Sequence, residues 1–353
     1  MNTTNNFHVT FVRDDLARVV TKINLSKLNN SCLLITGASG FMGVWLTELL
    51  CYLIKEQDLN IKLYLLANDF TYARGEAPHL YEQNESIEII TDDVRTLHEL
   101  PSEVEWVIHA AASPDLRVHN SQPIYASQTI AQGTLSLLEC VTRLPNLKGF
   151  LNISSGYVYG YHSTKELITE KNFDGFDPGV FSTAYVEAKR YAESLCTIYR
   201  NQFRLPILNV RPFSFVGPYQ SVDAPWAVNN FINDVVNNQP IRVQGDGTAV
   251  RSYMYGADMA WWLLNILLRG ESGRSYNLGS PIAISLAKLA EKIKHLSGDR
   301  VEVNYSRALL KSKPSIFVPS VELAQSDVGL RMQFDIDSAL LRTIQWYEKK
   351  YKN

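Results

Sequence analysis

The amino-acid sequence predicts an α/β protein built around a doubly wound parallel sheet. Two observations predict this class: short apolar runs alternate with helix-length segments as far as about Phe215, and a glycine-rich turn joins the first run to the first helix. Strands that alternate with helices form parallel βαβ units. The predicted strands are Cys32–Ile35, Ile61–Leu66, Ile87–Ile90, Trp106–Ile108, Phe150–Ile153 and Ile207–Val210.

Helical segments separate several of these strands. One helical pattern runs from Phe41 to about Ile54, and two longer segments follow at Pro123–Leu144 and Ser182–Gln202. A further short helix is predicted near the N-terminus, where apolar residues recur at helical spacing and would pack onto the main body. Those apolar residues are Leu16, Val19, Val20 and Ile23.

The chain length predicts about two domains. We expect residues 1–30 to be an N-terminal extension and residues 31–215 to form the nucleotide-binding domain. A segment near 250–280 should return to pack on that domain, while 216–353 should form a smaller C-terminal α/β domain that binds the substrate. The ligand site is expected in the cleft between the two domains.

Composition excludes several classes of function. A formal net charge of −2 provides no general attraction for nucleic acid. The apolar run near 261–268 is far shorter than the ~20 residues of a membrane span, and the polar first six residues do not resemble a signal peptide. Four scattered cysteines without a CxxC pair predict reduced thiols, so we expect a cytoplasmic protein without a metal site.

A glycine-rich turn occupies residues 36–43, with the sequence TGASGFMG. Its glycines follow a variant of the Rossmann dinucleotide fingerprint: Gly37 permits the tight turn, Gly40 lets backbone approach a pyrophosphate, and Gly43 permits close packing of helix on strand. An ordinary glycine turn has similar spacing, but the position between a strand and a helix favours the cofactor site. The predicted contacts are Gly37, Ser39, Gly40, Phe41, Met42 and Gly43.

Two acidic residues are candidates for the adenosine half of the cofactor. Asp69 follows the second strand, where a carboxylate accepts from ribose hydroxyls and rejects a 2′-phosphate. This favours NAD, although NADP is not excluded. Asp93, after the third strand, is placed to accept from the adenine amino group. For both residues the alternative is an exposed turn position.

A Tyr-x-x-x-Lys pair in the segment Ser182–Gln202 predicts the catalytic site. Tyr185 and Lys189 lie one helical turn apart, on the side marked as packed by four apolar residues. Those residues are Ala184, Ala188, Ala192 and Leu195. The pair Tyr161 and Lys165 has the same spacing, but its polar intervening residues suit a loop.

Ser155 gives the first pair its context, because it directly follows the strand Phe150–Ile153. A doubly wound sheet presents its chemistry at the C-terminal ends of its strands. Ser155 would hold a substrate hydroxyl, and Tyr185 would take its proton as hydride leaves the same carbon for a nicotinamide. Lys189 would lower the pKa of the phenol, which is about 10 in a free tyrosine.

At this point the sequence resembles the extended short-chain dehydrogenase/reductase superfamily, in its nucleotide-sugar epimerase/dehydratase branch. The resemblance runs from about Ser31 to the C-terminus. It rests on the ordered motifs 36–43, 109–111, Ser155 with 158–160, Tyr185 with Lys189, Arg211 with 216–218, 245–247, 251–253, Asp258 and 276–280.

The resemblance implies a bound NAD(P), a nucleoside-diphosphate sugar as substrate, and transient oxidation at C4 of that sugar. It implies further cofactor contacts at Val94, Ala110, Ala111, Tyr185, Lys189 and Pro212. Implied substrate contacts are Ser155, Gly156, Tyr157, Ser214 and Arg251, of which Arg251 would pair with the diphosphate. A homodimer through the helices 123–144 and 182–202 is expected by analogy.

Departures from the family pattern bear on the reaction. Similar 4,6-dehydratases carry Asp-Glu immediately after the catalytic hydroxyl residue, and similar sugar-acid decarboxylases usually keep the Glu, whereas this chain has Gly156-Tyr157. Epimerases tolerate neutral residues there, because they only rotate and re-reduce the 4-keto sugar. Two family asparagines are also replaced, by Ile130 near the nicotinamide and by Ser214 near the phosphates.

Four functions remain open, with an epimerase preferred. A dehydratase with an atypical acid/base pair and an NAD(P)H-dependent 4-keto-sugar reductase are the enzymatic alternatives. A cofactor-binding scaffold without catalysis is the least favoured, since Ser155, Tyr185 and Lys189 are all present.

Overall fold

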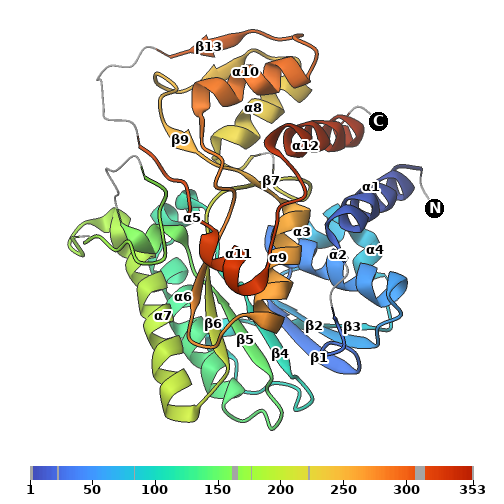
Figure 1. The fold of residues 1–353 in the computed structure, drawn as a ribbon, viewed down its shortest axis with the longest axis vertical. Coiled ribbons are helices and arrows are strands. Elements are labelled where there is room, and N and C mark those ends of the chain that lie inside the picture. The colour runs from blue at the N-terminus through green and yellow to red at the C-terminus, as the bar shows by residue number, and fades with distance from the viewer. Residues whose placement is uncertain are drawn as a thin grey trace.

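A seven-stranded parallel sheet forms the centre of the molecule in a computed structural model of the chain (Figure 1). The structure describes residues 3–21, 24–82, 84–160, 166–175, 177–221, 223–306 and 315–351. The strand order is β11-β6-β5-β4-β1-β2-β3, so the order reverses between β1 and β4. Their bounds are β1 Ser31–Thr36, β2 Ile61–Ala67, β3 Ile87–Thr91, β4 Trp106–His109, β5 Gly149–Ile153, β6 Ile207–Pro212 and β11 Ser275–Leu278.

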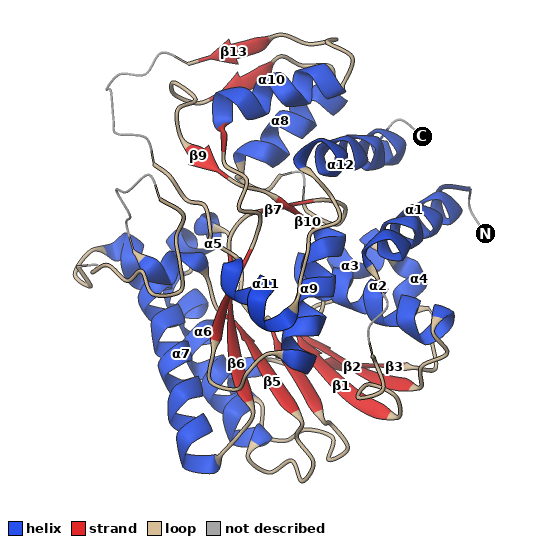
Figure 2. Cartoon of the chain, viewed as in Figure 1, coloured by secondary structure: helices blue, strands red, loops and turns tan. Residues whose placement is uncertain are grey.

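Both faces of the sheet are apolar and both are covered by helices, which is why the strands are nearly continuous hydrophobic runs. Alternate residues of β1 divide between the faces: Leu33 and Ile35 belong to one buried cluster, and Leu34 to the other. The first cluster lies under α2 (Phe41–Glu56) and α9 (Gly256–Arg269). The second lies under α6 (Pro123–Val141) and α7 (Ala184–Phe203), on the opposite side of the sheet in Figure 2.

A smaller layer of helices and short strands lies beyond one end of the sheet (Figure 1). It contains α8 (Ala227–Val236), α10 (Leu286–Leu296) and α12 (Ile336–Tyr351) with three strand pairs. The paired strands are β7 Phe215–Val216 with β10 Met254–Tyr255, β8 Ile241–Val243 with β13 Val303–Tyr305, and β9 Val250–Arg251 with β12 Ile284–Ser285. The short helix α11 (Glu322–Val328) packs near β11.

The chain returns to the main sheet between these two parts. Strand β11 pairs with β6 in parallel, and α9 packs against α2. The remaining short helices are α3 Thr71–Glu76, α4 Pro78–Tyr81, α5 Leu116–Ser121, η1 Val94–Thr96, η2 Gly156–Tyr159 and η3 Phe181–Thr183.

The N-terminal helix differs from its prediction. Helix α1 spans Thr3–Val19, so it begins earlier than the apolar spacing indicated and ends before Val20. Leu16 and Val19 are buried as expected, but Phe11 and Val12 join them in the core, and Ile23 lies outside the described residues. Helix α1 runs beside α12, which brings the two ends of the chain close together (Figure 1).

The other predicted elements agree with the structure to within a few residues. The six predicted strands are all present, and the predicted helices at 41–54, 123–144 and 182–202 correspond to α2, α6 and α7. Across the described ranges, no helix combines the length and the hydropathy that crossing a membrane requires.

Candidate active site

Ser155 lies just beyond the C-terminal end of β5, at the start of the one-turn helix η2. Its side-chain oxygen accepts a hydrogen bond from the backbone N–H of Tyr157 at 3.2 Å, which fixes the hydroxyl at the strand tip. Ser155 is buried, with 6% of its surface exposed. The serine therefore lies where parallel sheets usually position reactive groups.

Tyr185 and Lys189 reach this strand tip from the first turns of α7. The Lys189 ammonium donates a hydrogen bond of 2.7 Å to the carbonyl oxygen of Ile153, the last residue of β5. The phenol of Tyr185 is hydrogen-bonded to the side chain of Ser155. The structure thus brings together the three residues for which the sequence predicted catalysis. The alternative pair, Tyr161 and Lys165, lies outside the described residues.

Burial has the largest effect on the pKa values of Tyr185 and Lys189. It raises the pKa of Tyr185 to about 12, and the hydrogen bond from Ser155 opposes that rise. Burial also lowers the pKa of Lys189 to about 8, while the nearby carboxylate of Glu193 opposes the decrease. We expected the Lys189 ammonium to lower the pKa of the Tyr185 phenol. In the structure the ammonium instead donates its hydrogen bond to the Ile153 carbonyl.

An apolar contact supports the other side of the tyrosine. Ile130 of α6 packs with Ala188 and Ala192 of α7 in a small buried cluster, and Tyr185 borders it. Ala188, Ala192 and Leu195 are buried as predicted, whereas Ala184 is exposed because it is the first residue of α7. Ile130 occupies one of the two positions at which an asparagine was expected from the family resemblance. It therefore places a hydrocarbon side chain, rather than a polar one, beside the Tyr185 phenol.

A buried ion pair anchors α7 to the sheet. The Arg211 guanidinium donates to both carboxylate oxygens of Glu193, at 2.9 and 2.6 Å, and also to the Tyr159 hydroxyl at 3.0 Å. Glu193 lies one turn after Lys189, and Arg211 lies on β6. This two-point contact fixes the rotation of α7, and with it the direction in which Tyr185 and Lys189 face.

The glycine-rich turn has the close packing that its pattern requires. A Cβ atom on Gly37 would lie 2.5 Å from the Ala110 carbonyl oxygen, and one on Gly43 would lie 2.5 Å from the Ala38 Cα. Gly40 is exposed and precedes α2, whose N-terminus receives no side-chain cap. The free N–H groups there, with Ser39, Phe41 and Met42 alongside, fit the pyrophosphate of a dinucleotide.

The two acidic candidates for adenosine contacts are both engaged locally. One Asp69 oxygen accepts from the backbone and side chain of Thr71 at 2.8 and 2.7 Å, which leaves its other oxygen available for a ribose. Arg95 holds both oxygens of Asp93 at 2.9–3.0 Å through Nε, and its cation lies over the Tyr125 ring. These contacts lower the pKa of both carboxyl groups, so both are anionic at neutral pH.

The other cofactor candidates lie around the same edge of the sheet. Ala110 and Ala111 follow β4 and are partly buried, and Val94 begins η1 and is buried. Pro212 ends β6, where it lies opposite Leu278 of β11. These positions flank the glycine-rich turn and the tip of β5.

The predicted substrate residues come from both parts of the chain. Gly156 and Tyr157 continue from Ser155, with Gly156 buried and Tyr157 47% exposed. Ser214 is partly buried, and its carbonyl accepts from Met254 N. Arg251 is partly buried on β9, and its Nη1 donates to the carbonyls of Val250 and Ser315 at 2.8 and 2.9 Å.

Sequence reasoning missed two groups at this site. His119 of α5 packs edge-on against Tyr185, with ring centroids 4.5 Å apart. Phe213 and Phe317 lie beside Gly156, which no local pattern could indicate because Phe317 is 161 positions away in the sequence. His119 could have been considered from the sequence, because it follows shortly after the motif 109–111.

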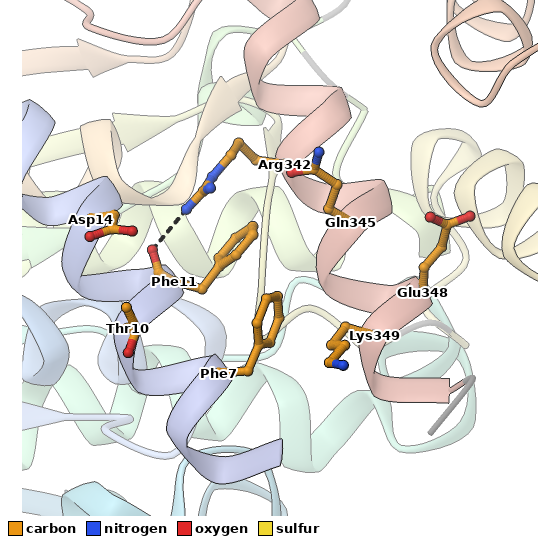
Figure 3. Close-up of a pocket in the computed structure, with 8 residues that line it drawn as sticks. All are labelled: Phe7, Thr10, Phe11, Asp14, Arg342, Gln345, Glu348 and Lys349. Atoms are coloured by element: carbon orange, nitrogen blue, oxygen red, sulfur yellow. Dashed lines mark hydrogen bonds between the residues drawn. The ribbon is translucent and has the colours of Figure 1, made fainter. Parts of the chain in front are cut away.

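A separate groove of about 550 Å³ lies between α1 and α12 (Figure 3). Phe7 and Phe11 of α1 face Arg342 and Lys349 of α12 across it, and Arg342 Nη2 donates to the Phe11 carbonyl at 2.8 Å. None of the predicted site residues lines this groove. The described residues also contain no cluster of three metal-ligating side chains.

Comparison with known proteins gives a match to a family model. The model described as the NAD dependent epimerase/dehydratase family matches residues 33–279. Among curated proteins, UDP-glucuronic acid decarboxylase 1 of Xenopus tropicalis is 27% identical over 331 residues, which cover 93% of this chain and 75% of the relative.

Solved structures with a similar fold include two enzymes of this kind. The UDP-glucose 4-epimerase of Thermotoga maritima, solved with UDP-glucose, has a TM-score of 0.76 at 20% identity, covering 90% of this chain and 99% of that one. The dTDP-glucose 4,6-dehydratase of Bacillus anthracis, solved with NAD, has a TM-score of 0.75 at 20% identity, covering 91% and 98%. These likenesses show a shared fold.

Proposed function

This chain belongs to the NAD dependent epimerase/dehydratase family, and on that premise we propose that it is a nucleotide-sugar epimerase acting through transient oxidation at C4 of the sugar. The observation that carries this proposal is the convergence of Ser155, Tyr185 and Lys189 at the tip of β5. Relatives named for nucleotide sugars and a similar structure solved with NAD support the substrate class and the cofactor.

Each residue of the candidate site would have its own role at the sugar. Tyr185 accepts the proton of the C4 hydroxyl and later returns it, while Ser155 holds the same oxygen by a hydrogen bond. The Lys189 ammonium, bonded to the Ile153 carbonyl before the transfer, would stabilise the negative charge that forms on Tyr185 during the transfer. NAD, when bound, would supply the acceptor for the hydrogen and electron pair of C4. The turn at Gly37–Gly43, Asp69 and Asp93 would hold it, and Arg251 would hold the substrate diphosphate.

An epimerase is preferred over a dehydratase because of the space around Gly156. A Cβ atom there would lie 2.9 Å from the Phe213 and Phe317 rings, so the position that carries Asp in similar dehydratases has no room for a side chain. An epimerase would return the hydride to C4 of the rotated 4-keto sugar and would eliminate no group, so it would require no acid beyond Tyr185. The dehydratase with atypical residues and the 4-keto-sugar reductase remain the alternatives.

Mass spectrometry of the products distinguishes these reactions. We would incubate NAD-loaded protein with a panel of nucleotide sugars, without external reductant. An epimerase gives an isomer of unchanged mass, whereas a dehydratase gives a product lighter by one water and a decarboxylase one lighter by carbon dioxide. Turnover that needs stoichiometric NAD(P)H would identify a reductase, and no conversion of any sugar would contradict the proposal.

We also propose a cytoplasmic homodimer. Tyr191 and Ile198 lie two turns apart on α7 and are 53% and 51% exposed, and Ile124 of the adjacent α6 is 73% exposed. Burial of these apolar groups would stabilise a dimer. Sedimentation analysis of wild type and of the double variant Tyr191→Glu with Ile198→Glu tests this, since the variant should be monomeric.

The thiols of all four cysteines are free, which supports the proposed cytoplasmic location because the cytoplasm is a reducing compartment.

A further inference from the structure

Three aromatic rings form one wall of the candidate active site. Tyr157 and Phe317 are stacked, with centroids 4.7 Å apart and planes inclined by 15°. Phe317 also stacks with Phe213, at 4.5 Å and 30°. We call Tyr157, Phe213 and Phe317 the aromatic shelf. Backbone pairing of residues 315–317 with β9 holds Phe317 in place, since its N–H donates to the Val250 carbonyl at 3.0 Å.

The aromatic shelf extends from the proposed catalytic residues toward the proposed diphosphate ligand. At one end the backbone N–H of Tyr157 donates to the Ser155 hydroxyl oxygen at 3.2 Å. At the other end Phe317 is hydrogen-bonded to Val250, which precedes Arg251 on β9. A sugar held between Ser155 and Arg251 would therefore lie along the shelf, and the 47% exposed ring of Tyr157 is open to a ligand.

The aromatic shelf carries no charged side chain. Phe213 and Phe317 fill the space that a side chain at Gly156 would need, because their ring carbons lie 2.9 Å from the position of its Cβ. The next residue, Tyr157, provides a phenol. The two positions after Ser155 thus present ring faces and one hydroxyl to the sugar.

Ring faces discriminate between a neutral sugar and a sugar acid. The face of an aromatic ring carries partial negative charge, which attracts the C–H groups of a sugar and repels a carboxylate. A carboxylate taken out of water also needs a cation or several donors. Arg251 already donates to two backbone carbonyls and is assigned to the diphosphate.

We propose that the aromatic shelf binds the C–H face of an uncharged sugar, so that this enzyme prefers neutral nucleotide hexoses to nucleotide uronic acids. This specificity rests on the proposed function and narrows its substrate class. It also separates the chain from the decarboxylase named for UDP-glucuronic acid, to which it is 27% identical.

Binding of matched sugar pairs to the NAD-loaded protein tests the proposal. Glucose and glucuronic acid, which differ only at C6, would be compared by calorimetry on uridine, thymidine and guanosine diphosphates. We expect the glucose form of the preferred nucleotide to bind about tenfold more tightly or better. Equal or tighter binding of the glucuronic acid form would overturn the shelf proposal and leave the proposed function standing. Failure of every pair to bind would overturn the proposed function itself.

Variants at Tyr157 test whether the ring is responsible. Tyr157→Leu should weaken binding of the glucose form about fivefold but the glucuronic acid form much less, so the preference falls. Tyr157→Phe retains the ring and should retain the preference. Tyr305→Leu, at a 45% exposed tyrosine on β13, is the matched control. A purely structural role would weaken both sugars equally, and an unchanged preference in Tyr157→Leu would refute the proposal.

Discussion

The ammonium nitrogen of Lys189 lies 2.7 Å from the carbonyl oxygen of Ile153, and this hydrogen bond joins α7 to the end of β5. Ser155 follows two residues after that carbonyl, and Tyr185 lies one turn before the lysine. A single contact between two main elements thus sets the distance between the proposed base and the hydroxyl that would hold the substrate. Because Lys189 is buried, the contact is shielded from water.

Replacing Tyr185 by Phe should abolish turnover and spare cofactor retention. The variant removes the proposed proton acceptor but keeps the ring that packs beside Ile130 and His119. We expect a loss of at least about 10²-fold in kcat, within the range of general acid–base catalysis. Turnover is measured by product analysis, and retained NAD by absorbance of the purified protein. Unaltered turnover would rule out Tyr185 as the base.

The pH profile should depend on Lys189. In the proposed mechanism the reactive form of the site has an ammonium on Lys189, whose pKa is about 8, and a tyrosinate on Tyr185, whose pKa is about 12. In wild type, kcat/KM should therefore rise about tenfold per pH unit below about pH 8 and level off above it.

In Lys189→Met the ammonium is absent, so nothing should level the profile at that point. The rate should be lower throughout and should keep rising above pH 8 toward the pKa of the phenol. Lys189→Arg keeps a charge and serves as the control. An unchanged inflection near pH 8 in Lys189→Met would show that another group produces it.

Loss of the Glu193 charge should destabilise the fold. Glu193 and Arg211 form a buried pair whose side chains are 14% and 6% exposed. Breaking such a pair leaves an unpaired buried charge, at a cost of about 3 kcal/mol. Glu193→Gln should lower the melting temperature by roughly 5 °C. Glu187→Gln on the same helix, opposite the partly exposed Arg190, should change stability by less than about 0.5 kcal/mol. Equal effects of the two substitutions would contradict the assigned role of the buried pair.

Local sequence patterns predicted most of the central sheet. Buried parallel strands leave a strong signal, so the apolar runs match the observed strands to within a few residues. The candidate catalytic residues could also be predicted from the sequence, because Ser155 follows a strand and Tyr185 shares a helix face with Lys189. Their convergence follows from the parallel βαβ arrangement rather than from any one motif.

Long-range contacts were beyond reach of the same reasoning. Stacking of Phe317 on Tyr157 depends on pairing of residues 315–317 with β9, which lies far from Tyr157 in the sequence. The full length of α1 was missed because its first turns are polar, while Phe11 and Val12 are buried by contacts with later parts of the chain. Protonation also depends on burial, which the sequence does not state.

Adding a methyl group at Gly156 should be costly. The Cβ atom of an alanine there would lie 2.9 Å from the rings of Phe213 and Phe317. Gly156→Ala should therefore destabilise the protein by about 1–3 kcal/mol through overpacking. Gly75→Ala, where nothing lies within 4 Å of the new atom, should be neutral or stabilising. Thermal unfolding of the two variants measures the difference, and a tolerated alanine at 156 would show that the rings move aside readily.

Protonation of His109 should weaken the fold in acid. Its Nδ1 lies 2.7 Å from the Thr36 hydroxyl oxygen, and its Nε2 lies 3.0 Å from that of Thr134. The Thr134 hydroxyl already donates to the Ile130 carbonyl, so it accepts from His109 Nε2–H, and Nδ1 accepts from Thr36. A proton on Nδ1 would break the bond to Thr36. Burial, together with the charge of Lys189, lowers the pKa of His109 to about 3.

The sign of the pH dependence follows from these two states. Unfolded His109 binds a proton near pH 6.5 and the folded form only near pH 3, so stability present above pH 6.5 is lost as the pH falls through that window. The loss is about 1.4 kcal/mol per pH unit, or about 2 kcal/mol at pH 5. Burial raises the pKa of Asp15 and Asp258 to about 6, which acts in the opposite direction between pH 6 and 4.

Comparison with His109→Gln isolates the histidine from those carboxyl groups. Urea unfolding between pH 7 and 4.5 should show the variant less stable at pH 7 but losing less stability in acid, with the difference narrowing by about 2 kcal/mol at pH 5. His295→Gln, at a side chain that is 81% exposed, should follow wild type. Parallel curves for wild type and His109→Gln would show that another group causes the acid sensitivity, and that His109 can accept a proton without leaving its site between β1 and α6.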